Sequence, residues 1–481
     1  MSQDQLPRRY RAPGFKAGLP PGGIKSALPG GNTVGGWIRE AEPRKDGYRH
    51  VDTPAMIELL QRIGANHYFF GIWDSPTDFD DLRLEFAPAA QAAGIQLLPY
   101  IVPPTETYSW GRASRPYVMD YLAWAKALAE LSLEYPVLTG WAIDDFDCGD
   151  NPAVFTPEYL AEIREAQFAI NPDLGFFTCA YHGSATSDEF MIKYGPYIDG
   201  IIYPYLDGPN INTIVTDRVR QDITEINEVA RRHDVGLIFL VYTGRFLDGV
   251  LAPTAEYAGS CVSQAVQAAA EGETFGVVSY GLQVDGAPTV ANERRSMYGD
   301  GRGALVASHA RIKAGDYAEL STKITIDPGS PRYELSFWHS RALQLWRIPQ
   351  RGDFRILVLV DGAQVWAADV HDATWQQLWV QGLDPQGQFD VSSAMIGKTE
   401  ATLSFRLTAL RDISGRSVDV GVDHLETIGF SLADPGFEDP AAWQVRSSGG
   451  PIVGLVDVFV PDRPAQIIEA VGAAYRQQPQ S

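Results

Sequence analysis

The chain has 481 residues, of which 45% are hydrophobic and 11% aromatic, which is enough for two packed cores rather than one. Its 39 basic and 60 acidic residues give a formal net charge of −21 at pH 7. This charge repels phosphate backbones and anionic membrane surfaces, so we expect no nucleic-acid partner and no membrane partner. A neutral or cationic ligand is favoured.

Neither a metal nor a disulfide framework is predicted. The three cysteines, Cys148, Cys179 and Cys261, are odd in number and lack the spacing of a zinc site. The first residues lack the apolar core of a secretory signal, and no run of about 18 apolar residues occurs. We therefore expect a cytoplasmic protein, or a secreted one if a leader was trimmed. The sequence leaves a monomer and a homo-oligomer equally open.

From residue 31 to about 285, short apolar runs alternate with segments of helical periodicity. The expected strands are residues 33–38, 65–73, 95–101, 137–145, 175–181, 200–205, 235–242 and 274–282. The expected helices include residues 53–63, 80–93, 117–133, 156–169, 217–232 and 254–270. Eight such units in about 255 residues predict a (β/α)8 TIM barrel of the α/β class.

After about residue 300 the pattern changes to successive strands separated by Gly, Pro and Asp turns, which predicts an antiparallel β-sandwich. Residues 463–475 then form one amphipathic segment behind Asp462, with an apolar stripe that we expect to pack on the barrel. The expected division is an N-terminal arm at 1–30, a catalytic barrel at 31–296 and a sandwich with a C-terminal helix at 297–481.

The fourth expected strand ends in three carboxylates, Asp144, Asp145 and Asp147. Side chains alternate along a strand, so Asp145 and Asp147 share one face, with α-carbons about 6.5 Å apart. Mutual repulsion and desolvation are expected to raise at least one pKa toward the range of acid catalysis. The alternative is that these acids cap the following turn.

The segment Ile143-Asp144-Asp145-Phe146-Asp147 resembles the acidic D-x-x-D-x-D-x-E motif on strand four of chitinase-like barrels. Residues 199–207, DGIIYPYLD, resemble the Met-x-Tyr-Asp type segment on strand six of that family. The resemblance covers these two short segments. It implies that Asp147 is the general acid and Asp145 its orienting partner, with Tyr203 or Tyr205 and Asp207 over the sugar. The chain departs from the motif in having Asp at the position of the acidic Glu.

A barrel carries its active site at the C-terminal ends of its strands, and here these ends carry polar and aromatic residues. Aromatic rings stack on the apolar C–H faces of sugars. We interpret Phe70, Tyr100 and Trp141 as core packing. The candidate substrate-binding residues are Trp37, Trp73, Asp74, Glu106, Tyr181, His182, Tyr203, Tyr205, Tyr242, Arg245 and Tyr280.

The resulting hypothesis is a glycoside hydrolase that acts on a neutral oligo- or polysaccharide, with Asp147, Asp145 and Asp207 as catalytic residues. Hydrolysis needs a proton donor and a second carboxylate, for which Asp207 is preferred over Asp74, Glu106 and Asp285. No phosphate-binding loop with the G-x-x-x-x-G-K-[ST] pattern is present, so no nucleotide cofactor is expected.

The C-terminal runs at residues 333–337, 360–362 and 418–421 resemble the galactose-binding-like sandwich modules appended to many glycosidases. That resemblance implies a carbohydrate-binding module. Two rival functions stay open. One is a non-catalytic carbohydrate-binding protein, and the other is a metal-assisted lyase or hydrolase that holds a divalent ion with Asp144, Asp145, Asp147 and Asp207.

Overall fold

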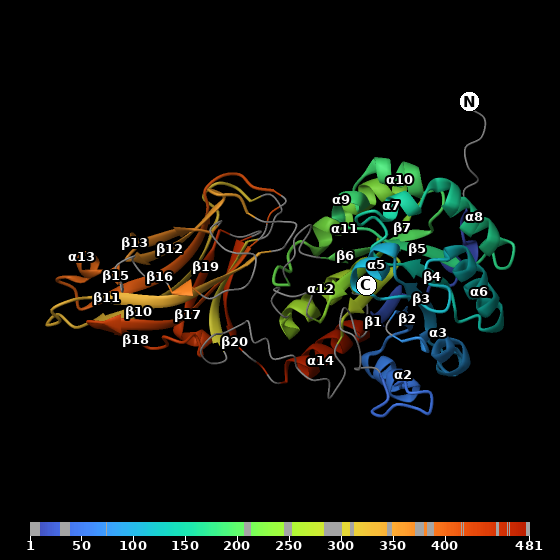
Figure 1. Ribbon diagram of the computed structural model, residues 1–481, viewed down its shortest axis with the longest axis horizontal. Coiled ribbons are helices and arrows are strands. Elements are labelled where there is room, and N and C mark those ends of the chain that lie inside the picture. The colour runs from blue at the N-terminus through green and yellow to red at the C-terminus, as the bar shows by residue number, and fades with distance from the viewer. Residues whose placement is uncertain are drawn as a thin grey trace.

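The structure is a computed structural model. It describes residues 10–28, 39–73, 75–205, 213–244, 253–282, 301–307, 312–343, 349–370, 380–381, 389–414, 416, 418–448, 452–458, 460 and 462–477. Figure 1 shows a barrel ringed by helices on one side and a pair of β-sheets on the other. The predicted TIM barrel followed by an antiparallel sandwich is confirmed.

Eight parallel strands close the barrel in chain order, each paired with the next and the last with the first. They are β1 (Ile24–Leu28), β2 (His67–Ile72), β3 (Gln96–Ile101), β4 (Gly140–Ile143), β5 (Gly175–Cys179), β6 (Gly200–Tyr205), β7 (Gly236–Tyr242) and β8 (Gly276–Tyr280). The last seven lie within the expected ranges.

The first strand differs from the expectation. β1 spans Ile24–Leu28, whereas the expected strand at 33–38 lies outside the described residues. The run IKSAL contains two polar residues and therefore gives a weak strand signal. Tyr475 contacts both positions in the fold, because the Lys25 ammonium donates to the Tyr475 carbonyl and the Ser26 backbone carbonyl accepts from the Tyr475 hydroxyl.

One short helix, α1, precedes β1, and the other helices follow the strands and cover the outside of the barrel (Figure 1). They are α1 (Pro13–Ala17), α2 (Thr53–Ile63), α3 (Asp78–Asp81), the π-helix η1 (Leu82–Phe86), α4 (Ala87–Ala93), α5 (Pro104–Trp110), α6 (Tyr121–Glu134), α7 (Asn151–Val154), α8 (Pro157–Phe168), α9 (His182–Ala185), α10 (Asp188–Tyr194), α11 (Val219–Ala230), the 3-10 helix η2 (Arg231–His233) and α12 (Ala255–Ala270). Side-chain caps set several of the starts. Thr156, for example, accepts from the amide of Tyr159 at 3.2 Å.

The barrel has two apolar layers because side chains alternate along each strand. Residues such as Tyr100, Ile202 and Tyr242 fill the interior. Neighbouring positions of opposite parity, such as Trp141 and Tyr203, belong to the larger core between the strands and the helices. The parity of a residue on its strand therefore decides whether its side chain can reach the barrel mouth.

The C-terminal part contains two six-stranded sheets, ordered β13-β12-β16-β10-β18 with β19 on β10, and β14-β11-β17-β9-β20 with β15 on β11. Residues of both sheets, including Phe337 and Phe405, form one core. The elements are β9 (Gly301–Ala307), β10 (Tyr317–Ile326), β11 (Glu334–Leu343), β12 (Phe354–Val360), β13 (Ala363–Asp369), β14 (Val380–Gln381), β15 (Phe389–Asp390), α13 (Ser392–Met395), β16 (Glu400–Ala409), β17 (Val418–Ile428), β18 (Phe430–Leu432), the 3-10 helix η4 (Pro440–Ala442), β19 (Gln444–Ser447) and β20 (Ile452–Val458).

The last helix, α14 (Arg463–Arg476), returns from the sandwich to the barrel and packs against α12 and α2 (Figure 1). Its buried stripe, Ile467, Ile468, Val471 and Tyr475, is the one predicted from the sequence. The Tyr475 hydroxyl reaches the strand layer, where it lies 2.9 Å from the Ser279 hydroxyl and also donates to the Ser26 carbonyl. α14 thus fastens the end of the chain across the seam between β1 and β8.

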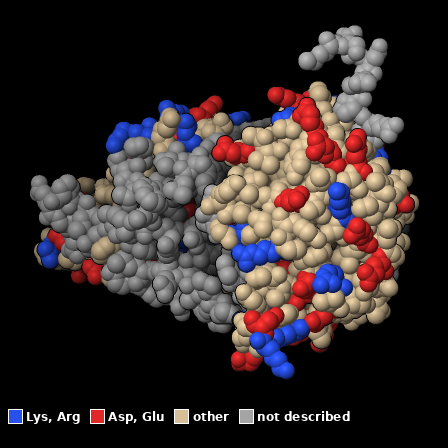
Figure 2. Space-filling view, turned by 45° about the vertical axis from the view of Figure 1, so that its right-hand side comes forward, with Lys and Arg blue, Asp and Glu red and all other residues tan. Residues whose placement is uncertain are grey.

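On the barrel face of Figure 2, Asp and Glu side chains are scattered with Lys and Arg between them, and the described part of that face has no concentrated basic patch. Among the described residues, no helix combines the length and the apolar character that crossing a bilayer requires.

Replacing Tyr475 by Phe should lower the free energy of unfolding by about 1–3 kcal/mol, because the buried Ser26 carbonyl and Ser279 hydroxyl would lose a partner. Urea unfolding followed by fluorescence measures the change. Tyr48→Phe is the control, since the Tyr48 side chain is half exposed. Equal stability of both variants and the parent would contradict this role of α14.

Candidate active site

Strand β4 ends at Ile143, and Asp144 to Asp147 form a turn. Asp145 has a φ of 39°, a left-handed conformation that Asp tolerates better than most residues. Side-chain alternation along a strand, from which we expect Asp145 and Asp147 to share a face, therefore does not extend beyond residue 143. The turn instead brings together the carboxylates of consecutive residues: an oxygen of Asp144, an oxygen of Asp145 and the Cys179 sulfur lie within 4.8 Å of one another.

Asp144 lies above the barrel interior. One of its oxygens accepts from the Tyr100 hydroxyl at 2.8 Å and from the backbone amide of Asp145 at 2.9 Å. Burial raises the pKa of this carboxyl, and the hydrogen bond from Tyr100 opposes the rise because it stabilises the charged form. Asp144 keeps part of its surface exposed, so a ligand at the barrel mouth can reach it.

Asp145 accepts a hydrogen bond from the Tyr181 hydroxyl at 2.7 Å. Burial, followed by the negative charge of Asp144, raises the pKa of Asp145 to about 7, although the bond from Tyr181 acts in the other direction. This carboxyl therefore exchanges its proton in the neutral range, which suits a general acid or base.

Glu106, on α5, is only 7% exposed and accepts from Nη1 of Arg112 at 2.6 Å. Burial and the charge of Asp144 raise the pKa of Glu106 to about 9, with Arg112 opposing them. The Arg112 guanidinium in turn lies over the Trp73 ring, 4.6 Å from its centroid. Glu106, Asp144 and Asp145 thus form one electrostatically coupled set, called the carboxyl triad below.

Asp147 stands apart from this set. Burial raises its pKa, and hydrogen bonding with Ser184 of α9 opposes the rise. Its Oδ1 is buried and accepts no hydrogen bond from the residues that the structure describes. Asp147 contributes to the pKa of Asp145 as a weaker neighbouring charge than Asp144 does.

Several predicted substrate-binding residues do gather around the carboxyl triad. The Trp73 ring makes an edge contact with Tyr100, with centroids 5.6 Å apart. Tyr242 and Tyr280 contact each other at 5.1 Å, at the ends of β7 and β8. Burial raises the pKa of the Tyr280 hydroxyl well above its ordinary value, and the charge of Asp144 adds to the effect. The mouth is therefore lined with neutral aromatic hydroxyls beside the acids.

Three predicted residues lie elsewhere. Tyr203 and Tyr205 have the outward parity on β6, and their hydroxyls bond to Asp222 at 2.7 Å and to the Val215 carbonyl at 3.0 Å. His182 lies 3.2 Å from Glu225 of α11. These contacts anchor the helical layer, so the structure does not bring the three side chains to the triad. Trp37, Asp74, Asp207 and Arg245, together with Asp285, lie outside the described residues.

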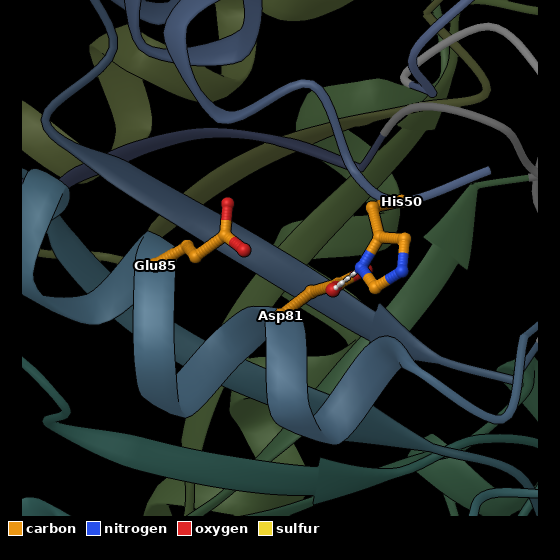
Figure 3. A group of neighbouring side chains, drawn as sticks. All are labelled: His50, Asp81 and Glu85. Atoms are coloured by element: carbon orange, nitrogen blue, oxygen red, sulfur yellow. Dashed lines mark hydrogen bonds and ion pairs between the residues drawn. The ribbon is translucent and has the colours of Figure 1, made fainter. Parts of the chain in front are cut away.

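Two further groups of possible metal ligands occur in the described part of the chain: His50, Asp81 and Glu85, and His182, Asp222 and Glu225. Figure 3 shows Asp81 turned toward the His50 ring, at 2.6 Å from Nδ1, and one ligand atom of each of the three residues lies within 4.8 Å of the others. Arg44 already pairs with Glu85, and Arg218 lies 3.5 Å from Asp222. Cations of the chain itself balance both groups, so we assign neither to a metal.

Two residues of the site, Tyr100 and Arg112, are not among those expected from the sequence. Tyr100 was interpreted as packing, yet it is the last inward-facing residue of β3 and its hydroxyl reaches Asp144. Its position at a strand end was an available signal. Arg112 was not singled out, because it follows α5 in a segment without periodicity, and only the folded chain brings it to Glu106.

No protein-family model matches this chain, and no curated protein sequence does. Solved structures that it matches include a glucosidase from Croceicoccus marinus, at 10% identity over 80% of this chain and 99% of that one, with a TM-score of 0.36. Others are the exo-beta-1,4-mannosidase Op5Man5 from Opitutaceae bacterium strain TAV5 (13%, 52% and 54%, TM-score 0.34) and Thermotoga maritima Cel5A (13%, 55% and 91%, TM-score 0.35). These similarities carry no argument about activity, and the barrel assignment rests on the strand pairing described above.

Proposed function

We propose that the protein is a glycoside hydrolase whose acid–base chemistry is carried by Glu106, Asp144 and Asp145. The observation that carries the proposal is the carboxyl triad itself: three coupled carboxyls with raised pKa values at the C-terminal ends of β3 and β4. Such a set holds both protonated and ionised members at neutral pH, as glycosidic cleavage requires.

In the proposed reaction Glu106, with the higher pKa, gives its proton to the departing glycosidic oxygen as the C–O bond breaks. Asp145 acts at the anomeric carbon, either as nucleophile or as the base that takes a proton from the attacking water. Asp144, held by Tyr100, keeps the Glu106 proton in place through its negative charge. The earlier assignment of Asp147 as the acid stays a prediction that the same variants test.

A saccharide without negative charge is the proposed substrate class. The carboxyl triad would repel an anionic ligand. Trp73, Tyr181, Tyr242 and Tyr280 offer the ring faces and hydroxyls that fit the C–H and O–H surfaces of sugars. Whether the sandwich binds carbohydrate belongs to the same proposal and is supported only by the sequence resemblance.

The variants Asp145→Asn and Glu106→Gln should each lower kcat on an aryl glycoside or oligosaccharide cleaved by the parent protein by about 10²–10⁴-fold, because each removes a proton-transfer group. Reducing-sugar release over a glycan panel measures this. The kcat of Asp147→Asn should fall by a smaller factor. Loss of activity in Asp147→Asn with full activity in Glu106→Gln would transfer the acid role to Asp147, and binding of glycans without any cleavage would favour the non-catalytic alternative.

The pH profile of kcat/KM should be bell-shaped, with a maximum between about 7 and 9. Below this range Asp145 (pKa about 7) is protonated, and above it Glu106 (pKa about 9) loses its proton. The two limbs belong to the carboxyl triad as a whole, which Asp147, Arg112, Tyr181 and Tyr280 surround. Steady-state kinetics at constant ionic strength measure the pH profile of kcat/KM. A maximum near pH 5 would contradict the assignment.

The Asp145→Asn variant should also be more stable than the parent, by a difference that grows as the pH rises. A carboxyl whose pKa is higher folded than unfolded favours the folded state when protonated, so its contribution to stability falls between about pH 4 and 7. The amide is always neutral. The variant should therefore gain about 4 °C in Tm over the parent at pH 7.5 and nothing at pH 4.

The exposed Asp188 provides a control of opposite sign. His233 and Arg232 lower its pKa, so Asp188→Asn should lose stability above pH 4 rather than gain it. Thermal unfolding of both variants and the parent at three pH values makes the comparison. A Tm of Asp145→Asn that falls relative to the parent as the pH rises would contradict the buried, raised-pKa description of Asp145.

A further inference from the structure

Asn151, the first residue of α7, is fully buried and makes three side-chain hydrogen bonds to two other segments. Its Oδ1 accepts from the Thr105 amide at 3.1 Å. Its Nδ2 donates to the Thr105 hydroxyl at 2.9 Å and to the Asp145 carbonyl at 2.7 Å. One side-chain amide therefore joins the segment before Glu106 to the turn that carries Asp145.

The hydrogen bonds of Asn151 stabilise both of the segments that they reach. Thr105 lies in the first turn of α5, whose amides have no partner within the helix, and Pro103 at the cap position supplies no side-chain bond. Asp145 has left-handed backbone geometry, which persists only where neighbours hold it. Its carbonyl accepts from Asn151 and, at 3.0 Å, from the Cys148 amide.

Only asparagine fits this position among residues of its size. Aspartate would accept from the Thr105 amide but could not donate, and it would add a charge beside Asp145. Alanine would offer neither function and would leave the Thr105 amide and the Asp145 carbonyl each short of a partner.

We propose that Asn151 is a positioning residue that fixes the placement of Glu106 relative to Asp145. The proposal rests on the proposed glycosidase function for its kinetic consequence, but not for its structural one. Proton transfer requires the two carboxyls in register with the substrate, and a displacement of about 1 Å at such a site costs about 10²-fold in rate. The three side-chain hydrogen bonds of Asn151 reach Thr105 and the Asp145 backbone and neither carboxyl group, so Asn151 acts through the segments that it joins.

The test compares Asn151→Ala with Asn66→Ala. Asn66 is a matched control at the opposite end of the barrel, where its side chain accepts from the Lys25 amide at 2.8 Å and donates to the Gly23 carbonyl at 3.0 Å. Both variants lose a bridging amide and should lose similar stability. Only Asn151→Ala should lower kcat, by about 10–100-fold with KM within about threefold, and shift both limbs of the pH profile.

A measurement without substrate separates this proposal from the proposed function. Carbodiimide labelling of carboxyls, followed by peptide mass spectrometry, should label Glu106 and Asp145 several times faster in Asn151→Ala than in the parent, with no change in Asn66→Ala. If the protein cleaves no glycoside but this labelling change occurs, the positioning role stands and the function fails. Unchanged labelling in a folded Asn151→Ala protein would overturn the positioning role.

Thr105 supplies a second pair of variants in case Asn151→Ala does not fold. Thr105→Val removes the hydroxyl that accepts from Asn151 and keeps the backbone amide, whereas Thr105→Ser keeps both. We expect a smaller loss of kcat and faster Glu106 labelling in Thr105→Val, with recovery in Thr105→Ser. Equal behaviour of the valine and serine variants would also contradict the proposal.

Discussion

The site depends on one electrostatic constraint, the crowding of ionisable carboxyls where the chain leaves β4. Burial and mutual repulsion disfavour the charged forms of Asp144, Asp145 and Glu106, so the set retains protons at a pH where isolated carboxyls would be ionised. Hydrogen bonds from Tyr100 and Tyr181 and the charge of Arg112 limit the rise. The balance of these terms gives the site its acid–base character.

The carboxyl triad and the contacts that fasten α14 to β1 and β8 lie at different ends of the barrel. Below the triad, mostly apolar side chains fill the barrel interior. Near the opposite end, the Tyr475 hydroxyl and the Lys25 ammonium connect α14 with β1 and β8. Tyr475 lies far in sequence from both strands, so residues that follow the sandwich in the chain cover the seam of the barrel. Destabilising carboxyls at one end are thus tolerated because packing elsewhere compensates for them.

The sequence predicted the barrel well because long-range order in this fold repeats a local signal, an apolar strand followed by a capped amphipathic helix. It failed at β1, where Lys25 and Ser26 interrupt the apolar pattern and Tyr475, about 450 residues later, binds the Lys25 ammonium and the Ser26 backbone carbonyl. Within the site, it identified Asp145, Trp73 and Glu106 but paired Asp145 with Asp147, because strand alternation was extended past the point where the chain turns.

By itself the sequence determined the order of the elements, the acidic end of β4 and the aromatic character of the strand ends, since each is a property of neighbouring residues. Only the tertiary structure decided which side chains meet. The barrel closes so that Tyr100 faces Asp144 while Tyr203 faces the helices, and it brings Arg112 and Asn151 to segments with which they share no sequence pattern. Parity and turn geometry fix these contacts, and both depend on where each strand stops, which the residue pattern leaves uncertain by one or two positions.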